Sequence, residues 1–372
     1  HHHSIMNVIR NNLLFLSLLV LSVSCTTFYV SPNGNDSNNG KSETTPFKTI
    51  QTAVYAADDP TVILMPGIYN GTDNSQISIN GDVTVIAQPG VTVSCLGTSN
   101  TAAFQFTWWS VNSSLAGFTI QDCEYGVYFE QGSFTRFGGF DNMVFRNLQY
   151  GIAHEEANVT VTNSRFENVH NGIVTLFGDD SVTVDNCSFY NVTSFAIYAT
   201  TCIGPYNISN SVFTFGKNSA ITSQFCHILI NNCTFAQNVA NSGAAIFANQ
   251  SSIIEINSSS FFANTAKIQG GAITLYDGSV LITNNTEFTK NSAQNGGAIS
   301  TAGTINIFNS AFTSNKASGY GGAFICDQSE NLLSNVLFSL NTAAKGPAFY
   351  CNKCVTLGKD VVVHGESGNC PL

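Results

Sequence analysis

The 372-residue chain is apolar and acidic: hydrophobic residues make up 43% of it, charged residues only 10%, and the formal net charge is −10. This balance excludes a disordered chain, because disorder requires low hydrophobicity together with high charge. It also argues against a nucleic-acid partner, since clustered Lys and Arg supply most of that affinity and the sequence contains no such cluster.

The N-terminal residues predict a targeting segment that precedes the fold. Residues 1–5 are a tag remnant or an overhang, and residues 6–25 are typical of a signal peptide. Arg10 supplies a basic start, and Leu13–Leu21 forms an apolar run too short to cross a bilayer. We therefore expect a secreted, extracellular protein from a eukaryotic host, with no membrane span.

Residues 26–59 are expected to lead into the fold through a short capping helix over residues 46–57. Thr45 suits the N-cap position, and Pro46 suits the first position of a helix. The apolar residues that would share one helical face are Phe47, Ile50, Val54 and Ala57. Such a helix would plug the open end of a solenoid that begins at Val62–Leu64.

From residue 60 to residue 353 the sequence repeats with gaps of 21–27 residues. One marker is a phenylalanine that follows a short alternating strand: Phe118, Phe145, Phe166, Phe189, Phe213, Phe235, Phe262, Phe288, Phe312 and Phe338. A second marker follows in step from Phe145 onward: Ile152, Ile173, Ile197, Ile221, Ile246, Ile273, Ile299, Phe324 and Phe349. A unit this short cannot bury its apolar face alone, so copies of it must stack.

The repeat predicts an all-β chain, a single right-handed parallel β-helix (a solenoid) of about a dozen coils. The hand follows from the rule for parallel crossovers. One internal ladder is expected to contain Ile173, Ile197, Ile221, Ile246, Ile273 and Ile299. Asparagines at a constant phase should stack as a hydrogen-bonded ladder at a turn: Asn238, Asn264, Asn291, Asn315 and Asn341.

Eleven cysteines agree with an oxidising compartment. Residues at equal phase in adjacent coils lie about 4.8 Å apart, which suits a disulfide. The register therefore predicts the disulfides Cys202–Cys226, Cys326–Cys351 and Cys95–Cys123, with Cys354–Cys370 stapling a C-terminal cap over residues 354–372. Cys187 and Cys233 share a phase two coils apart, so we expect both to be free and buried.

Eleven N-x-S/T sequons follow the signal segment, and we expect several to carry glycans. Their asparagines are Asn35, Asn70, Asn112, Asn158, Asn186, Asn191, Asn207, Asn232, Asn249, Asn257 and Asn284.

Two parts of the chain resemble known β-helices. Phe28–Asp36, Pro46–Gln51 and Pro66–Tyr69 are similar to the N-terminal region of pectin-lyase-like right-handed β-helices. The C-terminal half resembles the repeats of the polymorphic outer-membrane protein family, which pair F-x-x-N with G-G-A-I. Here these are Phe261–Asn264 with Gly270–Ile273, Phe288–Asn291 with Gly296–Ile299, and Phe312–Asn315 with Gly321–Phe324. In that family the repeats imply adhesive β-helices displayed at a surface.

An active site must be weighed, because pectate lyases and polygalacturonases share this fold. Gly178-Asp179-Asp180 resembles the paired aspartates of polygalacturonases, which use one carboxylic acid and one carboxylate. That family's Asn-Thr-Asp, Gly-His-Gly and Arg-x-Lys elements are missing from the corresponding coils. We therefore interpret Asp179 and Asp180 as turn residues, with no catalytic residues expected. A pectin-type hydrolase or lyase at this position is the alternative.

Two further groups leave alternatives open. Glu155, Glu156, Asp179 and Asp180 come one coil apart at the same bend, so they form either a calcium site or a solvated acidic corner. No other cofactor is expected. Trp108 and Trp109 are adjacent on a strand, so one should point outward and contact a sugar ring, although ordinary packing explains the pair equally well.

These observations favour a non-catalytic extracellular protein, an adhesive, matrix or wall component that binds glycan or protein through its flat faces. A fibre-forming subunit is a third hypothesis, because exposed coil ends can associate head to tail.

Overall fold

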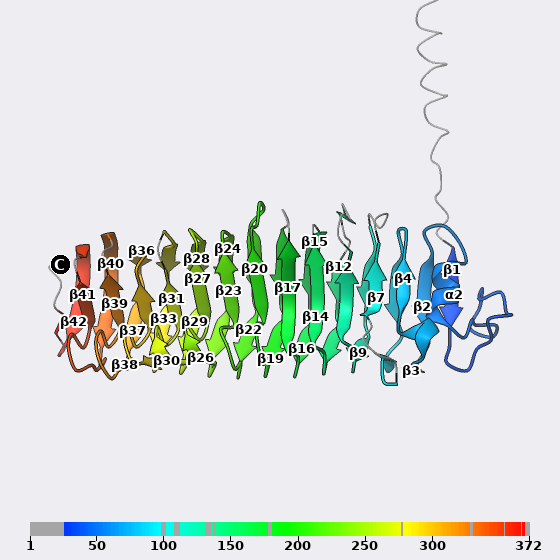
Figure 1. Ribbon diagram of the computed structural model, residues 1–372, viewed down its shortest axis with the longest axis horizontal. Helices are drawn as coiled ribbons and strands as arrows, with labels where there is room; N and C mark the ends of the chain where they lie inside the picture. The colour runs from blue at the N-terminus through cyan, green and yellow to red at the C-terminus, as the bar shows by residue number, and fades with distance from the viewer. Residues whose placement is uncertain are drawn as a thin grey trace, which may run out of the picture.

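We describe the chain from a computed structural model. The residues that it describes are 26–97, 102–107, 112–130, 135–136, 139–155, 157–177, 181–276, 278–327, 330–352, 354–365 and 367–368. The segments assigned to a tag or overhang and to a signal peptide, residues 1–25, lie outside them. The described residues form a straight rod of parallel strands, with coil stacked on coil from one end of the chain to the other (Figure 1).

Three parallel sheets, here named A, B and C, run along the rod. Sheet A has 26 described strands in two rows joined by a bend. The first row contains β1 (Thr27–Val30), β2 (Thr61–Leu64), β5 (Thr84–Ala87), β8 (Ser114–Ala116), β11 (Thr135–Arg136), β12 (Gly139–Asp141), β15 (Ala157–Thr162), β18 (Val182–Asp185), β21 (Tyr206–Ser209), β24 (His227–Asn231), β28 (Ile253–Asn257), β32 (Val280–Asn284), β36 (Thr304–Phe308), β40 (Glu330–Ser339) and β42 (Val355–His364). The second row contains β3 (Gly67–Tyr69), β6 (Val91–Ser94), β9 (Thr119–Gln121), β13 (Val144–Arg146), β16 (Arg165–Glu167), β19 (Ser188–Tyr190), β22 (Val212–Thr214), β25 (Thr234–Ala236), β29 (Ser260–Phe262), β33 (Glu287–Thr289) and β37 (Ala311–Thr313). The long strands β40 and β42 extend through both rows.

Sheet B faces sheet A across the interior and has 12 described strands. They are β4 (Ile77–Ile79), β7 (Ala102–Phe106), β10 (Tyr125–Phe129), β14 (Tyr150–Glu155), β17 (Asn171–Phe177), β20 (Ile197–Thr200), β23 (Ile221–Gln224), β27 (Ile246–Asn249), β31 (Ile273–Leu275), β35 (Ile299–Thr301), β39 (Phe324–Asp327) and β41 (Phe349–Asn352). Sheet C is short, with β26 (Val239–Ser242), β30 (Thr265–Gln269), β34 (Ser292–Ala293) and β38 (Lys316–Ala317).

Strand alternation and asparagine bends give each coil its shape. In β18, Val182 and Val184 are buried while Thr183 and Asp185 are partly exposed, as a period of two requires. The next residue, Asn186, has φ 52°, a left-handed conformation that asparagine tolerates. This turns the chain into the second row of sheet A.

The internal ladders confirm the predicted register. The six isoleucines from Ile173 to Ile299 pair coil by coil, and each is fully buried. Phenylalanine rings stack from Phe145 to Phe312 with centroids 4.6–4.9 Å apart. The asparagine ladder is also present and buried, with each side-chain amide donating to the next asparagine's Oδ1 at 3.0 Å.

Two of the ten marker phenylalanines, Phe262 and Phe118, do not belong to the internal phenylalanine stack. Phe261, not Phe262, stacks between its neighbours, and Phe262 points outward. A shift of one residue reverses the face, so of two adjacent phenylalanines only one can enter the core. Phe118 is also out of register, because Ile120 pairs with Phe145.

The predicted limits of the fold need correction at both ends. The capping helix α2 spans only Ile50–Val54, and its N-cap is Thr49, whose side chain accepts a hydrogen bond from the Thr52 backbone N–H. Phe47 is extended and bridges to Val30 instead. Strand β1 pairs with β2, so the first coil begins well before Val62. Strand β42 pairs along its length with β40, so the solenoid continues past residue 353. A further short helix, η1, covers Thr72–Asn74.

Two of the predicted disulfides are present, Cys95–Cys123 and Cys202–Cys226, each with a Cα–Cα distance of 4.9 Å. The predicted Cys326–Cys351 bond is wrong. The two residues are direct strand partners, but Cys351 is disulfide-bonded elsewhere and Cys326 is a thiol. Cys354 is also a thiol, which contradicts Cys354–Cys370; Cys370 itself lies outside the described residues. The register fixes the Cα spacing, whereas side-chain direction decides which sulfurs meet.

Cys187 and Cys233 are free and buried, as the register predicts. Burial raises the pKa of Cys187 to about 12 and that of Cys233 to about 11. At pH 8 roughly one molecule in a thousand, or fewer, would then carry either thiolate. We expect N-ethylmaleimide to leave both residues unmodified in the native protein and to label both in urea, as measured by peptide mass spectrometry. Rapid labelling without denaturant would contradict this placement.

Candidate functional site

Aromatic side chains line the outer face of sheet B. Register places Tyr128, Tyr198, Phe247 and Tyr350 in one outward-facing column, each partly exposed. Sheet B forms one long side of the rod, so this column follows the rod axis (Figure 1). The face is flat because successive strands continue in register.

The C-terminal half of this face is hollowed into a groove of about 440 Å³, here called the tyrosine groove. Its described lining residues are Gln269, Leu275, Tyr276, Ser300, Thr301, Ala302, Tyr320, Ile325, Asp327, Tyr350 and Asn352. Ser300, Ile325 and Tyr350 come from the outward column and form its floor. Turns on either side of the strands supply Tyr276 and Tyr320, which are exposed by 41% and 37%.

Local contacts hold the groove side chains in place. The Tyr320 and Tyr350 rings have centroids 4.7 Å apart and are tilted by 52°. The Lys345 ammonium lies 5.4 Å from the centroid of the Tyr320 ring. Asn352 Nδ2 donates to Asp327 Oδ1 at 2.9 Å, and the Tyr276 hydroxyl donates to Gln269 Oε1 at 3.5 Å. Tyr320 is therefore held by Tyr350 and Lys345 of the next coil, and Tyr276 by Gln269 of its own coil.

The groove has the chemistry of a binding site. Aromatic faces contact apolar sugar faces, while amides, hydroxyls and a carboxylate hydrogen-bond to sugar hydroxyls. Among its described lining residues, Asp327 is the one carboxylate.

A second aromatic cluster lies on the same face toward the N-terminal end. The Tyr125 and Tyr150 rings stack at 4.8 Å, and Tyr128 contacts Tyr125 at 5.3 Å. Burial, with smaller contributions from the charges of Glu155 and Glu130, raises the pKa of Tyr128. Two carboxylates therefore flank this tyrosine. The sequence interpretation included Glu155 but missed Glu130, which directly follows strand β10.

Of the six residues predicted as catalytic, calcium-binding or ligand-contact candidates, the structure describes one, Glu155. Trp108, Trp109, Glu156, Asp179 and Asp180 lie outside the described residues. Glu155 is described and ends β14, where the pairing with β17 shifts register. The eleven sequon asparagines are all described, and each is exposed or partly exposed. Ten lie off sheet B; Asn249, at the end of β27, is the exception.

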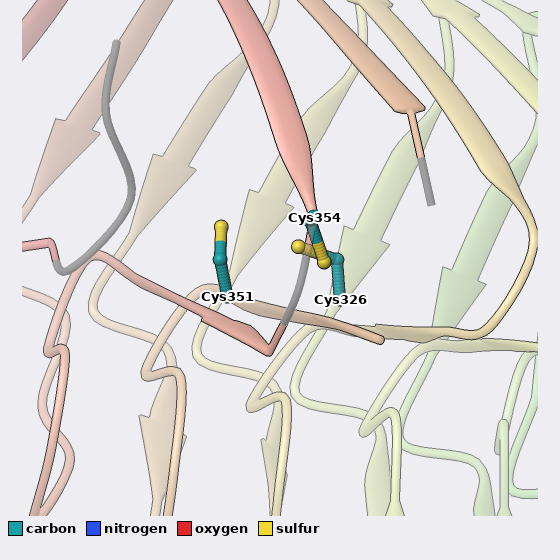
Figure 2. A group of neighbouring side chains, drawn as sticks. All are labelled: Cys326, Cys351 and Cys354. Carbon is teal, nitrogen blue, oxygen red and sulfur yellow. The ribbon is translucent and has the colours of Figure 1, made fainter. Parts of the chain in front are cut away.

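One group of metal-ligand side chains comes together within the part of the chain that the structure describes. The sulfurs of Cys326, Cys351 and Cys354 lie within 4.8 Å of one another (Figure 2). Zinc sites use three or four deprotonated protein ligands. Cys351 is already in a disulfide, so two thiols remain, too few for such a site.

Comparison with known proteins agrees with the geometry. Residues 105–261 match the family described as right handed beta helix region. Residues 279–302 match the Chlamydia polymorphic membrane protein repeat. These two segments are therefore similar to right-handed β-helix regions and to a Pmp repeat, in agreement with the parallel β-helix described above. No curated protein matches its sequence.

Several solved structures are similar to this β-helix. A GH87 alpha-1,3-glucanase from Streptomyces thermodiastaticus strain HF3-3 has a TM-score of 0.57 and 14% identity over 92% of this chain and 70% of that one. A GH136 lacto-N-biosidase from Eubacterium ramulus has a TM-score of 0.51 and 10% identity over 91% and 68%. Tailspike protein 3 of bacteriophage CBA120 has a TM-score of 0.50 and 11% identity over 88% and 61%. Such low identities show a shared fold alone.

Within the described part of the β-helix, no helix has the length and apolar character that a membrane span requires.

Proposed function

We propose that this β-helix is a non-catalytic extracellular protein that binds a neutral glycan in the tyrosine groove. The observation that carries the proposal is the convergence of Tyr276, Tyr320 and Tyr350 on one hollow beside amide and hydroxyl groups. An adhesive, matrix or wall role follows from binding along a flat face. The names of the glucanase and the biosidase, both glycan-active enzymes, support a glycan as the ligand class.

The charge of the groove favours neutral sugars over uronic acids. Asp327 is its one described acidic lining residue, no described lining residue is Lys or Arg, and the whole chain carries a net charge of −10. A polyuronate would therefore meet repulsion from the protein field. Lys345 lies beside Tyr320, and its ammonium is directed at the ring.

The positions of the sequons also favour the outer face of sheet B as the binding surface. Asn158, Asn207, Asn257 and Asn284 lie on sheet A strands, and Asn186 and Asn232 lie at the bend between its rows. If residues 6–25 direct secretion in a eukaryotic host, glycans at these positions would cover sheet A. The outer face of sheet B would stay largely bare for a partner.

The alternative is a polysaccharide-degrading enzyme on the same fold. The observation that favours it is the pair Glu130 and Glu155 beside Tyr128, since two carboxylates are what glycoside hydrolysis needs. Asp179 and Asp180 stay an untested candidate pair, as does calcium at Glu155, Glu156, Asp179 and Asp180. Fibre formation would require displacing α2, which covers the N-terminal coil (Figure 1).

Calorimetric titration with neutral oligosaccharides (xylo-, laminari- and chito-oligosaccharides) and with polygalacturonate tests the proposal. We expect at least one neutral series to bind and polygalacturonate to bind more weakly. Tyr320→Ala and Tyr350→Ala should each weaken binding about tenfold, because losing one ring–sugar contact costs about 1.4 kcal/mol.

The matched control is Tyr55→Ala, since Tyr55 is 57% exposed but lies beside the capping helix, far along the chain from the groove. The affinity of Tyr55→Ala for the neutral oligosaccharide should equal that of the wild type. Release of oligosaccharide during the titration, abolished by Glu130→Gln or Glu155→Gln, would establish the enzyme alternative instead.

A further inference from the structure

Two thiols, one from each of the last two described coils, lie in contact with one another. The Cys326 side chain points into the interior of the β-helix and is fully buried. Cys354, which directly precedes β42, is half-buried. Figure 2 shows their sulfur atoms directed at each other, while that of Cys351 points away. Burial, together with a hydrogen bond to Cys354, raises the pKa of the Cys326 thiol.

We propose that Cys326 and Cys354 are an oxidation site that closes into a further disulfide and clamps the last strand onto the preceding coil. The spacing repeats the pattern of Cys95–Cys123 and Cys202–Cys226. Those bonds join residues 28 and 24 positions apart, about one coil. Cys326 and Cys354 are likewise 28 positions apart (354 − 326).

The site differs from the other buried thiols of the core. Cys187 and Cys233 share a phase but belong to coils separated by β21–β22, so neither has a second thiol against it among the described cysteines. At the C-terminal end, three sulfurs lie within 4.8 Å of one another. A small-molecule disulfide can therefore oxidise Cys326 and Cys354 to a protein disulfide. It cannot do so at Cys187 or Cys233, since each lacks a neighbouring thiol in the part of the chain that the structure describes.

Exposure sets the order of the reaction with glutathione disulfide. Cys354, the accessible thiol, loses its proton and attacks one glutathione sulfur, which expels the other glutathione as a thiolate. Cys326 then passes its proton to solvent or to the released thiolate and attacks the Cys354 sulfur, which expels the second glutathione. Two protein thiols are oxidised, and one glutathione disulfide is reduced to two glutathione molecules.

The consequence concerns the exposed edge of the solenoid. Among the described strands, β42 is the last of sheet A, and its pairing is with β40 alone. Edge strands open more readily than central ones. A bond from Cys354 to the interior would hold the start of β42 and slow its opening.

Peptide mapping of the full-length protein after incubation with glutathione disulfide tests the proposal. We expect a linked Cys326–Cys354 peptide, while Cys187 and Cys233 remain alkylatable after denaturation. Limited proteolysis within residues 355–364 should slow several-fold. If Cys326 and Cys354 both remain thiols, if either is joined to Cys351, or if Cys354 keeps a glutathione adduct in the wild type, the proposal is wrong.

Two single variants separate the steps. In Cys326→Ser, the second attack cannot occur, so glutathione should stay bound to Cys354. In Cys354→Ser, Cys326 should remain a thiol, because burial withholds it from the reagent. Labelling of Cys326 by glutathione in that variant would overturn the assigned order.

Discussion

Gly297→Ala is expected to destabilise the β-helix by roughly 4–5 kcal/mol, near the upper limit for a single substitution. A Cβ atom at this position would lie 2.1 Å from the Gly322 carbonyl oxygen and 2.7 Å from the Lys316 backbone nitrogen. Both are backbone atoms of the next coil, so neither can move without breaking the stack. The second glycine of each G-G-A-I repeat is therefore required by close coil approach.

Urea unfolding monitored by circular dichroism measures this effect. Gly81→Ala is the matched control, because a Cβ there meets nothing within 4 Å. Its free energy of unfolding should stay within about 0.5 kcal/mol of the wild type. Equal stability of Gly297→Ala and Gly81→Ala would show that the coils are not stacked as described.

Asn291→Ala is expected to cost about 4 kcal/mol of unfolding free energy. The side chain is fully buried: its Nδ2 donates to the Phe261 carbonyl and to Asn315 Oδ1, and its Oδ1 accepts from the backbone and side chain of Asn264. Removing it takes partners from several buried polar groups, each at a cost of about 1–3 kcal/mol. The asparagine of F-x-x-N is thus a structural residue that joins three coils.

The same unfolding experiment on Asn231→Ala supplies the control, since Asn231 is an exposed strand residue. We expect it to change stability by less than about 0.5 kcal/mol. If Asn291→Ala and Asn231→Ala lowered the free energy of unfolding by similar amounts, the buried asparagine ladder would contribute no more to stability than an exposed asparagine.

Periodic features were predictable from the sequence because every coil repeats the same burial. The isoleucine and asparagine ladders follow from residue spacing alone, and the two disulfides follow from the same register. The sequence could not show which of the adjacent Phe261 and Phe262 points into the core. Repeat spacing identifies the coil in which a ladder residue lies, but coil lengths vary too much to identify the exact position. The ends could not be predicted well, since α2, β1 and β42 lie where the repeat stops.

The groove could not be predicted for a related reason. Tyr276 follows a sheet B strand, Tyr320 precedes a turn glycine, and Tyr350 lies within a strand, so the three share no phase. Only the folded coils bring them together. The one available signal was the position of Tyr350 beside the inward-facing Phe349, which required Tyr350 to point outward.

Hydroxyl-radical footprinting tests most directly whether the tyrosine groove is the binding site. Tyrosine oxidation is measured with and without a saturating concentration of the neutral oligosaccharide that binds best in the titration. If the oligosaccharide binds in the tyrosine groove, Tyr276, Tyr320 and Tyr350 will be protected, and Tyr55 and Tyr190 will be oxidised equally in both samples. Unchanged oxidation of the three groove tyrosines, with protection elsewhere on the rod, would contradict it.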